Sequence, residues 1–211
     1  EATVKVIMGT EKKSHVVTDH DKWITAYHEA GHAIVSYFLP TQDPVHQISI
    51  IPRGMAAGYT MYIPDTDNKH VSKTKLNEQI CSLLGGRAAE KLTQTDVCTG
   101  ASNDIERATE IARALVTKYG FSDRIGPLAL GNSNEEVFLG RDFGSHQNYS
   151  EQIAAIIDEE IKIIVMTQYN KAIELLKTHM TQLGYVAQLL FSNEKIDGDD
   201  FRAYMKESLQ A

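Results

Sequence analysis

The segment His28-Glu29-Ala30-Gly31-His32 has the residue types and the spacing of an HExxH motif. In a helix, positions four apart lie on one face, one turn from each other, so His28 and His32 can reach the same metal ion. Glu29 projects about 100° further round the helix, near such an ion but outside the pair. A carboxylate there can act as general base for a water molecule that zinc activates. The motif therefore predicts a zinc hydrolase site.

A structural role is the alternative interpretation of these two histidines, which would then only cap or pack a helix. The small residues Ala30 and Gly31 lie between the two imidazoles and leave them room. The flanking residues Trp23, Ile34 and Phe38 recur at helical spacing, as an amphipathic helix requires. These features favour the metal site.

A third protein ligand is needed, because a catalytic zinc ion usually takes three and keeps one position for water. The extended motif HExxHxxGxxH is absent, since Val35 and Phe38 occupy the positions of its glycine and third histidine. The third ligand must come from elsewhere in the chain. The acidic candidates are Glu78, Glu90 and Asp104.

Two of these candidates have a suggestive context. Glu90 follows the pair Gly85-Gly86 on a helix, where small residues permit close approach of another helix. Asp104 starts a helix. Each also has an ordinary explanation, a solvated helix charge for Glu90 and a dipole-stabilised N-terminal carboxylate for Asp104. Spacing alone leaves the choice open.

The elements that must position these residues are mainly helical, with one small β element. Hydrophobic spacing of three and four residues predicts the helices, and short β-branched or aromatic runs predict the strands. We expect helices over residues 19–39, 73–92, 103–119 and 150–183, a helical tail at 185–191 and 199–209, and strands at 45–51 and 58–63.

The expected helix ends rest on capping residues. Thr18 or Asp19 can cap the first helix, and Pro40 ends it. Asn103 with Glu106 resembles a capping box, and Gly120 suits a C-terminal stop.

Composition limits the class of protein. The chain has 211 residues, 42% hydrophobic and 23% charged, as in a folded domain. Its net charge of −7 argues against nucleic acid as a partner. No apolar run approaches the ~20 residues that span a bilayer. Cys81 and Cys98 belong to no CxxC pair, which argues against a thiolate zinc site. We expect two free thiols in a reducing compartment, and one disulfide between them is the alternative. Because the sequence starts with Glu1, we expect a fragment of a longer protein.

The sequence resembles the peptidase domain of the FtsH family, the membrane-anchored AAA+ zinc metalloproteases. Several segments in the same order and spacing carry the resemblance, which extends over nearly the whole chain. These segments are 25–33 (TAYHEAGHA), 48–54 (ISIIPRG), 84–90 (LGGRAAE), 99–105 (TGASNDI), 120–122 (GFS) and 137–140 (VFLG).

The resemblance implies a set of roles for the site residues. Asp104 would be the third zinc ligand beside His28 and His32, one zinc ion per chain, and Glu29 the catalytic base. Glu90 would orient one of the ligands. The implied fold is a helical metallopeptidase domain with a small β-hairpin or sheet beside the active site.

The implied domain organisation separates a linker from the peptidase. Residues 1–17 would be the remnant of a connection to an upstream ATPase, and residues 18–211 the metallopeptidase domain. Within it, residues 150–211 would form a helical part that supports oligomerisation. The GxxxxGK[ST] phosphate loop is absent from the sequence, so ATP and Mg²⁺ would act only through the missing ATPase module.

The implied function is that of a zinc endopeptidase within an ATP-dependent protease of protein quality control. An AAA+ module would deliver unfolded or membrane proteins, and water activated at the zinc would attack the peptide carbonyl. We expect a homohexamer whose parent protein is anchored in a membrane, on the cytoplasmic face of the bacterial inner membrane or alternatively in an organelle. The alternatives are an inactive ring-forming assembly module and a zinc hydrolase of another substrate class.

The segment 57–63 carries a further expectation. An unpaired strand edge beside the metal could bind an extended peptide through main-chain hydrogen bonds. An ordinary hairpin is the alternative.

Overall fold

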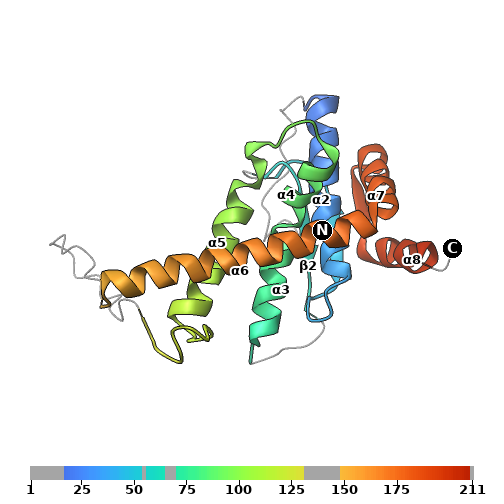
Figure 1. Ribbon diagram of the computed structural model, residues 1–211. Helices are drawn as coiled ribbons and strands as arrows, with labels where there is room; N and C mark the ends of the chain where they lie inside the picture. Colours follow the sequence, from blue (N-terminus) through green and yellow to red (C-terminus); the bar gives the residue numbers. More distant parts are fainter. Residues whose placement is uncertain (1–16, 54–55, 65–69, 131–147, 210–211) are drawn as a thin grey trace, which may run out of the picture.

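The computed structural model describes residues 17–53, 56–64, 70–130 and 148–209 (Figure 1). The elements follow in the order α2 (Asp19–Tyr37), β1 (Val45–Ser49), β2 (Tyr59–Tyr62), α3 (Lys73–Leu83), α4 (Gly85–Thr93), η1 (Thr99–Ala101), α5 (Ser102–Thr117), α6 (Glu151–Thr178), α7 (Met180–Asn193), β3 (Lys195–Asp197) and α8 (Gly198–Ser208). The prediction of a mainly helical domain with a small sheet is confirmed. The expectations for residues 1–16, Gly54 and 137–140 lie outside the described residues.

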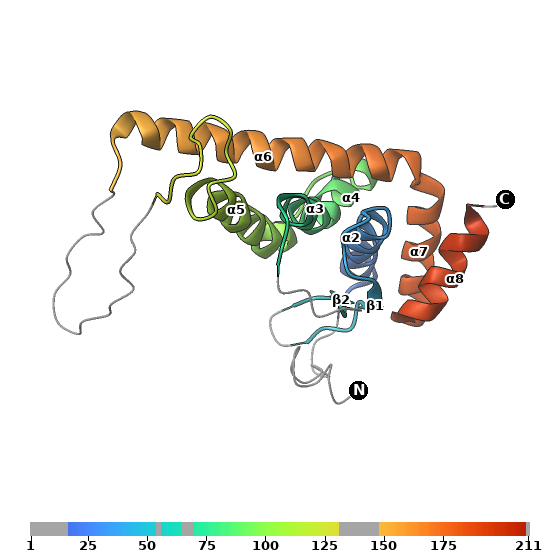
Figure 2. The same cartoon turned by 90° about the horizontal axis from the view of Figure 1, so that it is seen from below.

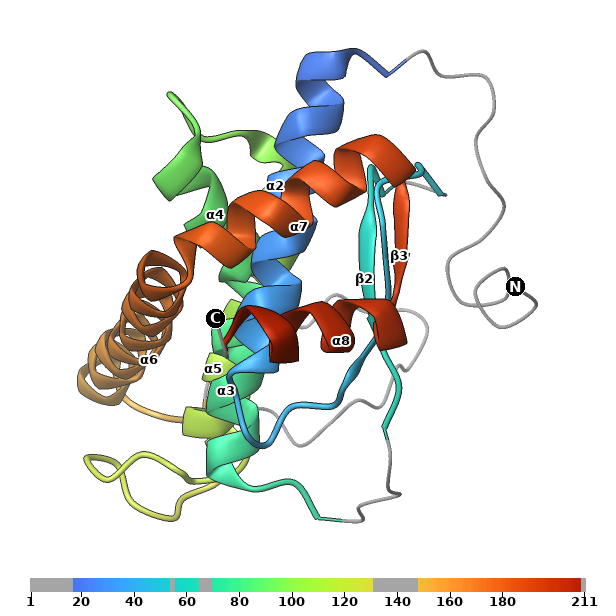
Figure 3. The same cartoon turned by 90° about the vertical axis from the view of Figure 1, so that its right-hand side faces the viewer.

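The helices and the sheet form layers (Figure 2). The long helix α6 runs along one side and covers α5, α3, α4 and α2, and the sheet lies on the opposite side of α2. Helices α7 and α8 close the end of the molecule where the sheet meets α2 (Figure 3). In the part of the chain that the structure describes, no helix combines the length and the apolar character needed to cross a bilayer.

Helix α2, which carries the HExxH motif, begins as predicted. The Thr18 side chain accepts a hydrogen bond from the backbone N–H of Asp21 and caps the helix. The helix ends at Tyr37, two residues before the predicted end at Leu39 and ahead of Pro40.

The single helix predicted over residues 73–92 is wrong. The structure contains two helices, α3 and α4, which meet at Leu84. A Cβ atom on Gly85 would lie 2.8 Å from the carbonyl oxygen of Gly31, and one on Gly31 would lie 2.5 Å from the carbonyl oxygen of Gly85. The glycines therefore permit backbone contact between α2 and α4, as their small size suggested.

Helix α5 differs from its prediction at the start. The short helix η1 leads into it, its N-cap is Ala101, and no side chain caps it, so the predicted capping box of Asn103 and Glu106 is wrong. Its end agrees better with the sequence, because Gly120 has φ of +61° just beyond the helix.

The sheet has three antiparallel strands in the order β2-β1-β3, so the predicted hairpin gains a strand from the C-terminal region. Strand β3 was not predicted, because three residues give too short a pattern to recognise. Ile48 at the centre pairs with Thr60 on one side and Ile196 on the other. Strand β2 is thus terminal in the sheet that the described residues form.

The single long helix predicted over residues 150–183 is also wrong. It is interrupted at His179, whose ring stacks on Phe38 with 3.8 Å between centroids. The chain then turns into α7 and packs against α2. This turn divides the apolar side chains between two cores, one around α2, α7 and α8 and the other among α3, α5 and α6.

Candidate metal centre

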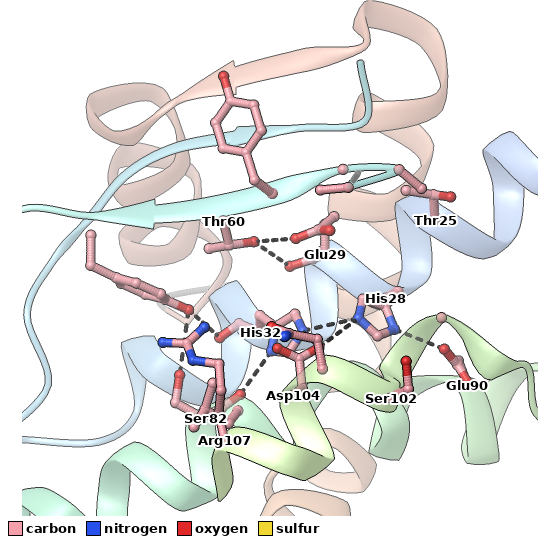
Figure 4. Close-up of a pocket in the computed structure, with 18 of the residues that line it drawn as sticks. Thr25, His28, Glu29, His32, Thr60, Ser82, Glu90, Ser102, Asp104 and Arg107 are labelled. Atoms are coloured by element: carbon pink, nitrogen blue, oxygen red, sulfur yellow. Dashed lines mark hydrogen bonds and ion pairs between the residues drawn. The ribbon is translucent and has the colours of Figure 1, made fainter. Parts of the chain in front are cut away.

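Three candidate ligands from two helices meet at one point (Figure 4). His28 and His32 come from α2, and their Nε2 atoms are 3.1 Å apart. Asp104 comes from the first turn of α5, and its Oδ2 atom lies 3.3 Å from each Nε2. The structure therefore brings together the pair predicted from HExxH and the aspartate that only the family resemblance singled out.

The spacing of these three atoms fits a zinc ion. In a tetrahedral site with bonds of about 2.0–2.1 Å, ligand atoms lie about 3.3 Å from one another. The observed separations of 3.1, 3.3 and 3.3 Å match that value. Two imidazole nitrogens and one carboxylate oxygen are also ligand types that zinc takes in hydrolases.

Hydrogen bonds on the far side of each imidazole turn Nε2 toward this point. His32 Nδ1 lies 2.8 Å from the carbonyl oxygen of Ser82, which can only accept, so Nδ1 carries a proton and the neutral ring has its lone pair at Nε2. His28 Nδ1 lies 2.8 Å from Oε1 of Glu90, which does the same for His28 when the ring is neutral. Both rings are thus oriented for ligation.

Glu90 is buried beneath His28 and is itself held in place. Its Oε2 accepts hydrogen bonds from Arg87 and from the backbone N–H of Cys98, each at 3.2 Å. Burial alone would raise the pKa of Glu90, but the hydrogen bonds from His28 and Cys98 and the charge of Arg87 lower it. Its carboxylate touches His28 at Nδ1, on the side away from the shared point.

The three candidate ligands influence one another's ionisation. Burial favours neutral His28, but its hydrogen bonds with Asp104 and Glu90 and the charge of Glu29 outweigh burial and raise the pKa of His28 to about 10. The hydrogen bonds from both imidazoles lower the pKa of Asp104 against the effect of burial. A concentrated negative charge therefore faces the imidazoles, as a cation site requires.

Gly86 provides the space in front of the imidazoles. A Cβ atom there would lie 2.5 Å from Nε2 of His28 and 2.6 Å from Nε2 of His32, where a bound ion belongs. From the sequence, close helix approach is the only role expected of the Gly85-Gly86 pair. Only the placement of α4 against α2 reveals it.

Glu29 lies beside the ligand set on the sheet side of α2 (Figure 4). Its side chain is buried, and its Oε2 accepts a hydrogen bond of 2.8 Å from the hydroxyl of Thr60 on β2. Burial raises the pKa of Glu29, while the charges of His28 and His32 and the Thr60 hydrogen bond oppose the rise. The cleft in front of it is bordered by β2 on one side and by α5, with Arg107, on the other.

Glu78, the remaining candidate ligand, lies elsewhere. Its Oε2 accepts hydrogen bonds from the backbone N–H of Thr41 at 2.9 Å and from the Thr41 hydroxyl at 2.6 Å. Its Oε1 is 3.7 Å from Nζ of Lys171 on α6. Cys81 and Cys98 are free thiols, as predicted.

Comparisons with known proteins agree with this geometry. A family model described as peptidase family M41 matches residues 15–204. The chain is 54% identical over 210 residues to the ATP-dependent zinc metalloprotease FtsH of Caldicellulosiruptor bescii, covering 100% of this chain and 34% of that protein. It is 47% identical over 211 residues to the protein of the same name from Thermotoga maritima, covering 100% of this chain and 35% of that protein.

A Thermoanaerobacter protein named ATP-dependent zinc metalloprotease FtsH 1 is 52% identical over 201 residues, covering 95% of this chain and 33% of that protein. The chain thus spans about a third of the length of these relatives. The family model includes the HExxH segment, the aspartate of α5 and most of the helices around them. The resemblance to the FtsH peptidase domain is therefore confirmed, and the chain belongs to peptidase family M41.

Proposed function

We propose that this chain is a zinc-dependent endopeptidase domain in which His28, His32 and Asp104 hold the zinc ion and Glu29 is the general base. One observation carries the proposal: three donor atoms lie 3.1–3.3 Å apart, each histidine being oriented through its other ring nitrogen. Zinc held there would lower the pKa of a bound water to about 7 and polarise a peptide carbonyl.

The protein's own residues would handle the proton. The Glu29 carboxylate accepts it from the attacking water and passes it to the nitrogen of the leaving amine. Burial of Glu29 favours its protonated form after the first transfer, since burial raises its pKa. Glu90 and the Ser82 carbonyl keep the two imidazoles fixed during both transfers.

The substrate would be an unfolded polypeptide bound as an added strand. Strand β2 borders the cleft and pairs with β1 on one side. None of the described strands pairs with its outer edge, which would offer main-chain groups to a peptide. Main-chain pairing does not depend on sequence, which suits a protease that degrades many proteins.

The chain would work within a longer, ATP-dependent protein, as its length relative to the FtsH relatives suggests. In this proposal an AAA+ module uses ATP and Mg²⁺ to deliver substrate, and residues 1–17 connect it to the peptidase domain at 18–211. The parent protein is a membrane-anchored homohexamer at the cytoplasmic face of the bacterial inner membrane. Helix α6 exposes Ile163 and Met166, which supports a subunit contact for residues 150–211.

The variant Glu29→Gln tests the chemistry. We expect about one zinc ion per chain in both forms, and cleavage of casein that falls about 10²- to 10⁴-fold in the variant, since general base catalysis contributes that much. The exposed Glu110 on α5 offers a matched control, and Glu110→Gln should leave cleavage unchanged. Metal analysis that finds no zinc, or undiminished turnover in Glu29→Gln, contradicts the proposal.

A further inference from the structure

The side chain of Thr60 links the edge strand β2 to Glu29. Its hydroxyl lies 2.8 Å from Oε2 of Glu29 and 3.2 Å from the backbone carbonyl oxygen of the same residue. One hydroxyl has one proton, so the shorter bond to the ionised carboxylate is the stronger of the two. The Thr60 hydroxyl therefore holds the side chain of Glu29, and the main-chain carbonyl oxygen of Glu29 is the weaker, competing acceptor.

The two oxygens of Glu29 have different surroundings. Oε2 receives the Thr60 hydrogen bond, whereas no described residue donates a hydrogen bond to Oε1. A Cβ atom on Gly58, the residue before β2, would lie 2.9 Å from Oε1, so glycine at this position keeps the space beside that oxygen clear of a side chain. The strand thus fixes one oxygen and leaves the other for a proton from water.

The pleat of β2 aims Thr60 at α2. Tyr59 and Met61 are buried on one face of the strand, while Thr60 and Tyr62 share the other. The Tyr62 hydroxyl lies 3.4 Å from the carbonyl oxygen of His32, one helical turn along α2 from Glu29. The same strand face therefore contacts α2 at Glu29 through Thr60 (Figure 4) and at His32 through Tyr62.

We infer that Thr60 is a positioning residue that fixes the Glu29 carboxylate in the orientation needed for proton transfer. The inference rests on the proposed role of Glu29 as general base. Because Thr60 belongs to the edge strand, a peptide that pairs with β2 would order the residue that orients the base. Binding of an extended substrate and alignment of Glu29 would then be coupled through one hydroxyl.

Kinetics of two variants test the inference. Thr60→Val keeps the shape but removes the donor, and Thr60→Ser keeps the donor. With the zinc-loaded chain and an unstructured fluorogenic peptide, we expect Thr60→Val to lower kcat about 10- to 100-fold and to change KM less than twofold. Thr60→Ser should recover kcat to within about threefold of the parent. Thr178→Val, which removes an exposed hydroxyl at the end of α6, is the matched control and should match the parent.

Urea unfolding of the zinc-free chain gives a readout that does not involve activity. Thr60→Val should lower the unfolding midpoint more when Glu29 is present than in a Glu29→Ala background, where the hydroxyl can still donate to the main-chain carbonyl oxygen of residue 29. The role of Thr60 would be overturned by equal losses of kcat in the Val and Ser variants or by an effect on KM alone. It would also be overturned if Thr60→Val changed the unfolding midpoint equally with and without the Glu29 side chain. If Glu29→Gln loses turnover while Thr60→Val retains it, the base assignment survives and this inference fails. Full turnover in Glu29→Gln would contradict both the role of Glu29 as general base and the positioning role of Thr60.

Discussion

Glu78 and Glu90 are buried carboxylates on consecutive helices, α3 and α4, and both were candidate ligands from the sequence. They differ in what they face. Glu90 contacts His28 in the candidate metal centre, whereas Glu78 binds Thr41 in the segment after α2. Burial and charge are common to both, so neither property distinguishes a functional acid from a structural one. The partner does.

The two sites also use their carboxylates differently. Glu78 is satisfied by two hydrogen bonds from one residue and by Lys171 nearby, an arrangement that ties a loop to α3 and α6. Glu90 joins α4 to α2 through an imidazole whose other nitrogen points at Asp104. Substitutions around Glu90 should therefore change zinc affinity, whereas substitutions at Glu78 should leave it unchanged.

The largest effect on zinc affinity is expected for Asp104→Ala, because it removes one of three proposed ligands. We expect the zinc dissociation constant to rise by more than about 100-fold, measured by competition with a chromophoric chelator. Asp158→Ala, at an exposed position on α6, is the control and should bind zinc as the parent does. An unchanged affinity in Asp104→Ala would take that residue out of the site.

A smaller effect is expected for Glu90→Gln, which keeps the shape of the side chain but removes its charge. The zinc dissociation constant should rise about 10- to 100-fold, as for other residues that orient a metal-bound histidine. If Glu90→Gln weakened binding more than Asp104→Ala, the two assignments would be exchanged.

One pH unit should change zinc affinity less than Asp104→Ala and no more than Glu90→Gln. Raising the pKa of His28 to about 10 keeps this imidazole protonated at pH 7 in the metal-free chain, and zinc needs it neutral. Affinity should then rise about tenfold per pH unit near neutrality, with about one proton released per zinc ion. Calorimetry in buffers of different ionisation enthalpy measures that proton, and a heat independent of the buffer would contradict the shift.

The same pKa shift affects stability of the metal-free fold in the opposite direction. A group whose folded pKa is raised stabilises the fold fully below its unfolded pKa, about 6.5 for histidine, and this contribution is lost as pH rises through about 10. Alkaline conditions therefore favour metal binding while weakening the metal-free site.

The smallest effect on zinc is expected for Glu78→Gln. The amide retains one acceptor for Thr41 but loses the charge facing Lys171, so we expect a loss of about 1–3 kcal/mol in the free energy of unfolding. Zinc affinity should stay within twofold of the parent. Urea unfolding and chelator competition on the same sample separate the two quantities, and a large loss of zinc would end the contrast between Glu78 and Glu90.

The sequence predicted the parts of the site that depend on local spacing. HExxH placed two imidazoles on one helical face, and Thr18 marked the helix start. The proximity of Asp104 came from family resemblance, since no local pattern relates residues 76 positions apart. The roles of Gly86 and Thr60 depend on how α4 and β2 pack against α2, which composition and periodicity do not encode.

The fold was predicted in type more accurately than in its interruptions. Apolar spacing continues through Leu84 and His179, so periodicity joined α3 to α4 and α6 to α7. The breaks come from tertiary contacts, the Gly31–Gly85 backbone approach in one case and the His179–Phe38 ring stack in the other. Strand β3 forms because β1 offers it a partner, not because its three residues favour a strand alone.

The separation of the two apolar cores gives the proposed cofactor a mechanical role. Helix α2 contributes its buried side chains to one core and α5 to the other, yet their polar atoms converge on a single point. An ion bound there would cross-link the two halves of the domain at their boundary. Chelation would then remove this cross-link as well as catalysis, and only the contacts between the two imidazoles and Asp104 would still join the halves at this point.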